Sequence, residues 1–395
     1  MNILLHCDEY YPRHVPIAIR MNVISEIFQK DGHVVQILTG AESLDGGEKA
    51  EENAIYCPII PLKKKSSLFR MFNQLSFGVT SLFKSFHTGK TDVVLTSSPP
   101  ILIGPFAWLI ARIKHAVLVY DVRDIWPDVA LEMGSFSEES FYCKAFRMIA
   151  NFMYCHADII TTVSPGKVSA LRAKLPEEQR KKVWLVENGL DERFLQQVED
   201  PQVVQTYFQD DRCSIVYIGN IGLAQGLEHL IDLAEEMDPD VFQVLLFGDG
   251  AQRAKLEQLC ADKKLKHIHF CGRVDERTVY TVLKNATAAY IPLVNSNLKN
   301  SIPTKTYEAL GTGCPVLMVA DGDAAELIRE SGFGSVISPD DVEKLPDVFV
   351  AFMKNYRSFA TRKDQARQYI LEHHSRQKIT SDFEKKLMVY VEERR

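Results

Sequence analysis

The sequence predicts an α/β protein of two domains, each built on a parallel, doubly wound sheet. Three observations lead to this fold class. The chain has 395 residues, which is more than one compact core usually takes up. Short apolar runs of strand character alternate with stretches of helical periodicity, as they do where helices cover both faces of a parallel sheet. The alternation pauses in the polar, Pro-containing segment 196–212 and then resumes, so we expect a second domain there.

The first domain is expected to span residues 1–195. Its first strand, 2–7, runs into a polar loop and then a helix that carries Ile19, Val23 and Ile27. That spacing places the three side chains on one helical face. Further strands are predicted at 33–39, 92–96, 117–121 and 158–163.

The second domain is expected to span residues 196–376, and the two sheets are expected to face each other across a cleft. Its strands are predicted at 214–218, 241–247, 267–270, 288–292, 316–319 and 335–337, with helices at 227–237, 252–261 and 278–285. The charged stretch 377–395 is predicted to be a final helix and is a candidate to pack back across the first domain.

Composition excludes several classes of protein. With 46% hydrophobic and 25% charged residues the chain is an ordinary globular protein, and a net charge of -6 argues against general nucleic-acid binding. The eight cysteines form no CxxC pair and no His/Cys cluster, and Met1 leads straight into a strand, so we expect reduced thiols in a cytoplasmic protein. The longest apolar run, 101–111, is shorter than the ~18 residues of a spanning helix.

The segment 62–91 is basic and apolar at once. It contains no Asp or Glu, and its cations are interleaved with Phe and Leu. Such a face suits an anionic bilayer, which would make the protein peripheral at the inner side of the cytoplasmic membrane. The alternative is a core helix with a solvated edge. The cations are Lys63, Lys64, Lys65, Arg70, Lys84 and Lys90.

Ligands of open α/β sheets bind beyond the carboxyl ends of the strands, and there the strand 214–218 meets a glycine-rich loop. Glycines let backbone N–H groups approach an anion closely, and a helix is expected to start directly after the loop, so the loop is a candidate diphosphate cradle. It matches neither GxGxxG nor GxxxxGK[ST]. Its candidate binding residues are Gly219, Asn220, Gly222 and Gln225.

Two further loops of the second domain carry candidates. Gly248 and Asp249 end the strand 241–247, where they either form a tight turn near a helix start or line a base pocket. The stretch 297–316 is the most informative. Pro303 can begin a helix there, so Lys305 and Glu308 would share one face near its mouth. Lys305 would then neutralise a phosphate and Glu308 would accept both ribose hydroxyls. The alternative is an ordinary exposed ion pair.

The order of the motifs GNIGLAQG, FGDG, FCGR, YIPL, SIPTKTYEALGTGCPV and DGDAAELI resembles the C-terminal half of the family four retaining glycosyltransferases. In the first half, YYP, TSSPP, VRDIWPD, TVS and ENGLD agree with it. The closest likeness is to bacterial fucosaminyltransferases of surface-polysaccharide clusters, such as those for O-antigen or capsule. The resemblance implies the GT-B fold, in which two Rossmann-like domains face across a cleft.

The resemblance also implies a function. It implies transfer of an N-acetylated 6-deoxyhexosamine, such as N-acetyl-fucosamine, from a UDP-sugar to a polyprenyl-diphosphate-linked saccharide, as in lipopolysaccharide biosynthesis. The first domain would bind the acceptor and the second the donor. The resemblance implies retention without a dedicated nucleophile and without a cofactor. Arg123 and Asp124 fall where the family has a His-Asp pair, so with Glu308 they are the catalytic candidates, the alternative for the first two being a structural pair. Pro303 and Thr304 join the donor-binding set.

Several positions depart from the family pattern. Ser301 replaces the first of two glutamates, and Asn220 and Gln225 replace the Arg and Lys of the phosphate loop. A diphosphate left without a cation would be costly, so we expect Lys305, together with Arg273, to supply the charge.

Three alternatives concern the metal and the activity. Asp321 and Asp323 spell the DxD of metal-dependent transferases, but a helix expected near Ala324 explains them as capping residues, so no metal is predicted. A nucleotide-sugar 2-epimerase would use the same two-domain cleft, but no His/Glu set for it is evident. A non-catalytic partner of another transferase is the third possibility, because of Ser301, Asn220 and Gln225.

Overall fold

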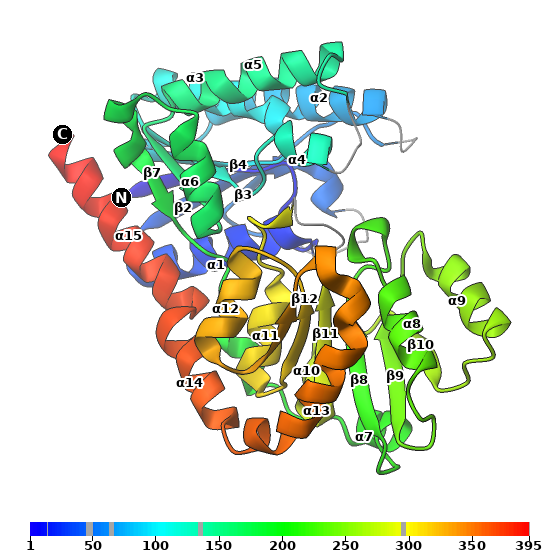
Figure 1. Ribbon diagram of the computed structural model, residues 1–395. Helices are drawn as coiled ribbons and strands as arrows, with labels where there is room; N and C mark the ends of the chain where they lie inside the picture. Colours follow the sequence, from blue (N-terminus) through cyan, green and yellow to red (C-terminus); the bar gives the residue numbers. More distant parts are fainter. Residues whose placement is uncertain (14, 45–49, 63–66, 133–136, 294–297, 395) are drawn as a thin grey trace. The chain divides into compact units, whose positions relative to one another are not determined.

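The computed structural model describes residues 1–394 except 14, 45–49, 63–66, 133–136 and 294–297 (Figure 1). The chain forms two compact units. Unit 1 consists of Met1–Glu187 and Gln377–Arg395, and unit 2 of Asn188–Arg376. Asn297 and Lys63, Lys64 and Lys65 of the sequence-based predictions lie outside the described residues.

Unit 1 is built on a seven-stranded parallel sheet with the order β3-β2-β1-β4-β5-β6-β7. The strands are β1 (Asn2–His6), β2 (Val34–Gly40), β3 (Ala54–Cys57), β4 (Val93–Ser98), β5 (Val117–Val122), β6 (Ile159–Thr162) and β7 (Val183–Leu185). The helices are α1 (Pro16–Lys30), α2 (Ser67–Ser85), α3 (Gly104–Ile113), α4 (Asp128–Glu132), α5 (Phe141–His156) and α6 (Pro165–Ala173).

The sheet of unit 1 has a core on each face, because successive side chains of a strand point to opposite sides. In β1, Leu4 belongs to the cluster under α2, α3 and α5, whereas Ile3 and Leu5 belong to the cluster under α1. Figure 1 shows α2, α3 and α5 gathered on the same side. The predicted doubly wound arrangement is therefore observed.

The sequence did not predict β3 and β7. Both are short edge strands, of four and three residues, and three of the four β3 residues are only half-buried. An edge strand this short produces neither an apolar run nor a clear alternation, so its sequence resembles a loop.

The last helix, α15 (Arg376–Glu393), packs on unit 1 as the sequence suggested. Phe383, Leu387 and Val391 recur every four residues and join the core beneath α1. The Glu384 carboxylate on the same helix lies 2.7 Å from Nε2 of the His33 ring.

Unit 2 is built on a six-stranded parallel sheet with the order β10-β9-β8-β11-β12-β13. All six strands were predicted, and they are β8 (Cys213–Ile218), β9 (Phe242–Phe247), β10 (Ile268–Gly272), β11 (Ala288–Pro292), β12 (Val316–Val319) and β13 (Gly334–Ile337). The helices are α7 (Pro201–Tyr207), α8 (Glu228–Glu235), α9 (Arg253–Asp262), α10 (Glu276–Asn285), α11 (Thr304–Thr312), α12 (Asp323–Ser331), α13 (Leu345–Ala360) and α14 (Lys363–His373).

The boundary between the units lies eight residues before the predicted one, between Glu187 and Asn188. Leu190 and Phe194 are the reason, since both are buried in the core of unit 2. Arg376 is the last residue of unit 2, and its side chain donates to the carbonyl oxygens of Asn188 and Gly189 at the start of the unit.

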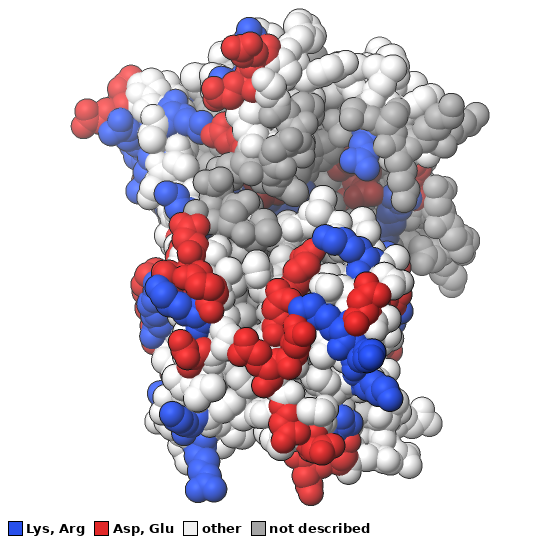
Figure 2. Space-filling model, turned by 45° about the vertical axis from the view of Figure 1, so that its right-hand side comes forward, with Lys and Arg blue, Asp and Glu red and all other residues white. Residues whose placement is uncertain are grey.

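Positive and negative side chains are interspersed on the face of the molecule that Figure 2 shows. This distribution agrees with the modest net charge of -6.

Candidate functional site

Two glycine-rich loops of unit 2 pack backbone against backbone at the carboxyl ends of β8 and β9. The N–H of Gly219 donates to Phe247 O at 2.9 Å, and the N–H of Ile221 donates to Asp249 O at 2.9 Å. Gly248 has φ +136°, and a Cβ atom there would lie 1.8 Å from the carbonyl oxygen of Gly219. A side chain at residue 248 would therefore push the two loops apart.

Lys305 brings a positive charge to this pair of loops. It lies in the first turn of α11, with Pro303 as the N-cap residue and Thr304 exposed at the first helical position. Its Nζ lies 4.2 Å from the centre of the Tyr217 ring, and a Cβ on Gly219 would be only 2.7 Å from it. Burial lowers the pKa of Lys305 to about 8, against the opposing charge of Glu308. A half-buried ammonium thus faces the backbone of the glycine loop.

Glu308 lies one turn further along α11 and is also half-buried. Burial raises its pKa, while the charge of Arg376 opposes that effect. Among the described residues, no ion pair within 4.0 Å joins Glu308 to Lys305 or to any other cation. The ion pair between Lys305 and Glu308, which was the alternative prediction from their spacing, is therefore absent. Both side chains are available to bind a ligand.

The rest of the glycine loop is neutral. Asn220 is exposed, and its carbonyl oxygen accepts a 2.6 Å bond from the Tyr217 hydroxyl. The side chains of Asn220 and Gln225 both lie against Gly222. The buried Oε1 of Gln225 has no hydrogen-bond partner among the described residues, so the site contains an acceptor that a ligand could satisfy.

The glycine loop does not open directly into a helix, which corrects the prediction for this segment. A short 3-10 turn, Leu223–Gln225, and a left-handed Gly226 intervene before α8. The first turn of α8 carries Glu228, paired with Lys255 at 2.9 Å. The helix whose amino end lies near the loop is instead α11, because Lys305 belongs to its first turn.

The remaining donor candidates of unit 2 are peripheral. Arg273 is 82% exposed, and its guanidinium lies 3.9 Å from the Asp249 carboxylate. Asp249 caps no helix, since its Oδ1 accepts from the next residue's N–H and α9 begins later, after Gln252. The N–H of Ser301 donates to Leu298 O at 3.0 Å. A contribution of Arg273 or Ser301 to donor binding stays a prediction.

Arg123 and Asp124 follow β5 in unit 1, but they do not form a pair with each other. The Arg123 guanidinium donates to Ser97 Oγ at 3.0 Å and to Pro99 O at 2.7 Å. The Asp124 carboxylate pairs with the nearly buried Lys167 at 3.0 Å. The same ammonium donates to the Arg123 carbonyl oxygen at 2.5 Å, so Lys167 fixes this loop.

A buried ion pair under this loop was missed by the sequence analysis. Arg20 of α1 donates two bonds to the Asp121 carboxylate, at 3.0 and 2.9 Å. The hydroxyls of Thr161 and Ser97 also donate to that carboxylate, and Arg20 lowers its pKa against the effect of burial. The available sequence signal was Asp121 itself, a charged residue in a strand of mostly apolar residues. Nothing in the sequence indicated its partner Arg20, which lies 101 residues earlier.

Asp321 and Asp323 do not cap α12 as predicted. The Asp321 carboxylate accepts a 2.9 Å bond from Ser338, the N-cap residue of α12 is Gly322, and Asp323 lies in the helix's first turn. The helix dipole favours a carboxylate at that position. Among the described residues, no three His, Cys, Asp or Glu side chains gather as a possible set of metal ligands.

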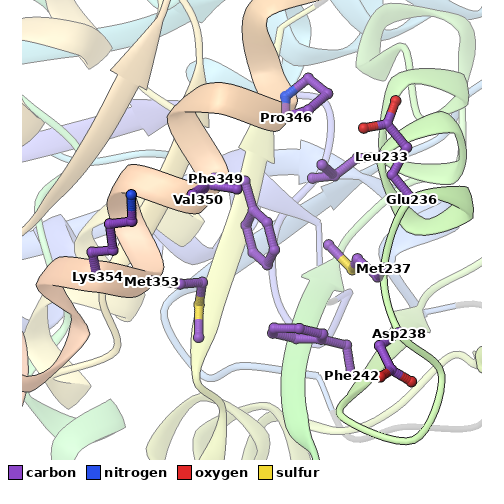
Figure 3. Close-up of a pocket in the computed structure, with 10 residues that line it drawn as sticks. All are labelled: Leu233, Glu236, Met237, Asp238, Phe242, Pro346, Phe349, Val350, Met353 and Lys354. Carbon is purple, nitrogen blue, oxygen red and sulfur yellow. The ribbon is translucent and has the colours of Figure 1, made fainter.

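A pocket of about 450 Å³ lies elsewhere in unit 2, between α8, the start of β9 and α13. Phe242, Phe349 and Met237 line it, with Lys354 at the side (Figure 3). Phe242 begins β9, so the pocket lies at the amino ends of the strands. The glycine loops are at the opposite edge of the sheet, and this pocket is not part of the candidate site.

Part of the segment 62–91 forms α2, which is amphipathic. Phe77 is fully buried, whereas Phe72, Phe83 and Phe86 are exposed. The neighbouring helices α3 and α5 add exposed apolar side chains, and α2, α3 and α5 contain no Asp or Glu. Within the described part of the chain, none of the helices combines the length and the apolar character that crossing a membrane requires.

The two units match two different family models. Residues 17–189 match the model described as a glycosyl transferase 4-like domain, and residues 199–369 match the model described as glycosyl transferases group 1. A relative in Escherichia coli (strain K12), whose name assigns it provisionally to glycosyl transfer in colanic acid biosynthesis, is 24% identical over 371 residues, which is 87% of this chain and 90% of the relative.

Solved structures share the fold. Sucrose-phosphate synthase from Thermosynechococcus elongatus has a TM-score of 0.80 at 16% identity, with 98% of each chain covered. Anabaena HepE, solved in complex with UDP-glucose, has a TM-score of 0.74 at 15% identity, covering 98% of this chain and 99% of HepE. Together with the two parallel-sheet units, these likenesses confirm the predicted GT-B fold.

Proposed function

The chain belongs to the glycosyltransferases of the GT-B fold, and on that premise we propose that it transfers a sugar from UDP to a saccharide acceptor with retention of the anomeric configuration. Unit 2 would bind the nucleotide sugar and unit 1 the acceptor. Support for the donor comes from HepE, a structural neighbour that was solved with UDP-glucose.

Lys305 carries the proposal. Its ammonium has no carboxylate within 4.0 Å among the described residues, and it faces the backbone of Gly219. The amino end of α11, whose first N–H groups have no intrahelical acceptor, adds partial positive charge at the same place. An anion is the ligand that such an arrangement favours, and the diphosphate of a nucleotide sugar supplies two negative phosphoryl groups.

Each donor-site residue then has a role. Lys305 would stabilise the diphosphate as it leaves, Glu308 would accept the two ribose hydroxyls, and Gln225 would offer its unpaired Oε1 to an N–H of the donor. Gly222 and Gly248 would let the donor approach the backbone. Without a protein nucleophile, retention requires that the acceptor hydroxyl attack on the face that the diphosphate leaves, where a phosphate oxygen can take its proton.

On the acceptor side, we propose that Arg123 holds a polar group of the acceptor. Asp124 would orient an acceptor hydroxyl through Oδ2, because Lys167 engages its other oxygen. The family resemblance supports an N-acetylated 6-deoxyhexosamine as the sugar and a polyprenyl-diphosphate-linked saccharide as the acceptor. The name of the Escherichia coli relative, which refers to colanic acid, supports surface-polysaccharide synthesis.

The proposal is tested by incubating the protein with UDP-sugars, with and without a lipid-linked saccharide, in excess chelator. We expect product only when acceptor is present and no effect of the chelator, because fixed groups would supply the positive charge that a metal supplies elsewhere. Interconversion of the sugar without acceptor would instead identify an epimerase. A rate restored only by magnesium or manganese would refute metal independence.

We also propose that the face formed by α2, α3 and α5 contacts the cytoplasmic side of a membrane. Apolar side chains and cations without any carboxylate on these helices suit an anionic surface, and each Lys or Arg contributes about 1 kcal/mol near it. Phe83→Asp should weaken co-sedimentation with anionic liposomes at low salt at least tenfold, whereas Val389→Asp on α15, also exposed, should not. Equal binding by both variants would contradict this proposal.

A further inference from the structure

We propose that the carboxylate of Asp8 binds hydroxyl groups of the acceptor saccharide and so positions it for transfer, together with Arg123. This inference rests on the proposed function and adds a residue that the sequence analysis did not select. It depends on three features of unit 1: the place of Asp8 in the sheet, the absence of a cation or side-chain donor at its carboxylate in the described residues, and the guanidinium whose charge acts on it.

Asp8 lies at the point of the sheet where the strand order reverses. It follows β1, which has β2 on one side and β4 on the other. In open α/β sheets, ligands bind just beyond the carboxyl ends of the strands at this point. The backbone of Asp8 is fixed there, because its carbonyl oxygen accepts a 3.0 Å bond from the N–H of Gly40 at the end of β2.

The Asp8 carboxylate is half-buried, yet no side chain in the described part of the chain donates to it. The backbone N–H groups of Asp8 and Glu9 are its only donors there, and no cation lies within 4.0 Å of it. The neighbouring Glu9 is paired with Arg13 at 2.7 Å. A partly buried carboxylate that no cation neutralises destabilises the fold in its charged form, and such groups concentrate at functional sites.

The charges around Asp8 act on its pKa in opposite directions. Burial raises its pKa to about 7, the charge of Glu9 raises it further, and Arg123 opposes both. The pKa of the buried Cys7 thiol is shifted by the charges of Asp8, Glu9 and Arg123, so these groups form one cluster beyond β1. At neutral pH the carboxyl group is therefore poised between its two forms.

Arg123 supplies the complementary group. Ser97 and Pro99 hold two of its nitrogens, while its Nη1 has no partner among the described residues. The charge of Arg123 lowers the pKa of Asp8, although the two side chains form no ion pair within 4.0 Å. A sugar hydroxyl can donate to a carboxylate and accept from a guanidinium at once, so a polyol fits between such groups. Asp124 offers only one oxygen to the acceptor, because Lys167 engages the other.

Asp8→Asn tests the inference. The amide keeps the shape but loses an acceptor, so kcat/KM for the acceptor should fall about 10- to 100-fold while affinity for UDP is retained. In the wild type, kcat/KM for the acceptor should rise between pH 6 and 8 as Asp8 ionises, and the variant should lack this rise. A merely structural role of Asp8 would not move the pH profile.

Stability provides a check on folding. Because the pKa of Asp8 is raised in the folded state, its ionisation destabilises the fold as pH rises through about 7. The variant should therefore unfold at no lower temperature than the wild type at pH 8. Asp8→Glu should restore part of the activity, and the matched control Glu178→Gln, at an exposed position of unit 1, should change kcat/KM less than threefold.

Three results would overturn the inference: an unchanged pH profile in Asp8→Asn, a lower unfolding temperature at pH 8, or a joint loss of UDP binding. Failure of the proposed function is distinguishable from these, because the wild type itself would then neither bind UDP nor transfer a sugar.

Discussion

Lys305→Met is expected to lower kcat/KM for the nucleotide-sugar donor by about 10²–10³-fold, because it removes a half-buried cation from the developing charge of the diphosphate. Asn220 and Gln225, at the positions where the family resemblance implies Arg and Lys, are neutral, and Arg273 is 82% exposed. The loss should therefore not be compensated within the loop. Steady-state kinetics with varied donor at saturating acceptor measures it.

The Lys305 variant should fold normally. Burial holds the pKa of Lys305 at about 8 in the folded state, well below that of a free lysine, so its charged form destabilises the fold below pH 8. Methionine removes that effect at similar volume, and the unfolding temperature at pH 7 should not fall. Lys255→Met, on the exposed surface of α9, is the matched control and should retain activity within twofold. Equal rates in the two variants would disprove the assignment of Lys305.

Glu308→Gln is expected to reduce transfer by about 10²-fold. A carboxylate accepts bonds from both ribose hydroxyls, whereas an amide presents one acceptor and one donor, which leaves one hydroxyl unmatched. The effect should appear mainly in affinity for the nucleotide, measured by titration with UDP.

Stability of the Glu308 variant separates binding from folding. Burial raises the pKa of Glu308, so the carboxylate destabilises the fold as pH rises through that raised value. The amide should leave the unfolding temperature at pH 7 unchanged or higher. Glu343→Gln, exposed in unit 2, is the control. A Glu308 variant that binds UDP like the wild type would rule out the ribose contact.

Most of the fold was predictable from sequence because the parallel strands are buried apolar runs. All six strands of unit 2 were found in this way, and so were five of the seven in unit 1. The short edge strands β3 and β7 give no such signal. The predicted boundary at 195/196 lies eight residues after the observed one, because Leu190 and Phe194 follow a loop-like segment yet enter the core of unit 2, which only tertiary packing reveals.

The candidate site was predictable where its parts are close in sequence. Lys305 and Glu308 share one helix, so their common face follows from their spacing. The contact of Lys305 with Gly219 and Tyr217, about ninety residues earlier in the chain, could not be read from any spacing. The same limit hid the partner of Asp124, because Lys167 lies 43 positions later. Asp8 could not be selected from the sequence, because only the structure shows that no cation pairs with its carboxylate among the described residues.

The central claim is that Lys305 of unit 2 holds the diphosphate of the donor, and the affinity for UDP as a function of pH tests it most directly. Calorimetry on the wild type should show affinity falling as pH rises above about 8, where the ammonium loses its proton. Lys305→Met should bind UDP at least tenfold more weakly at pH 7, with no such fall between pH 7.5 and about 9.5. A wild-type affinity constant over that range, or equal affinities at pH 7, would contradict the account.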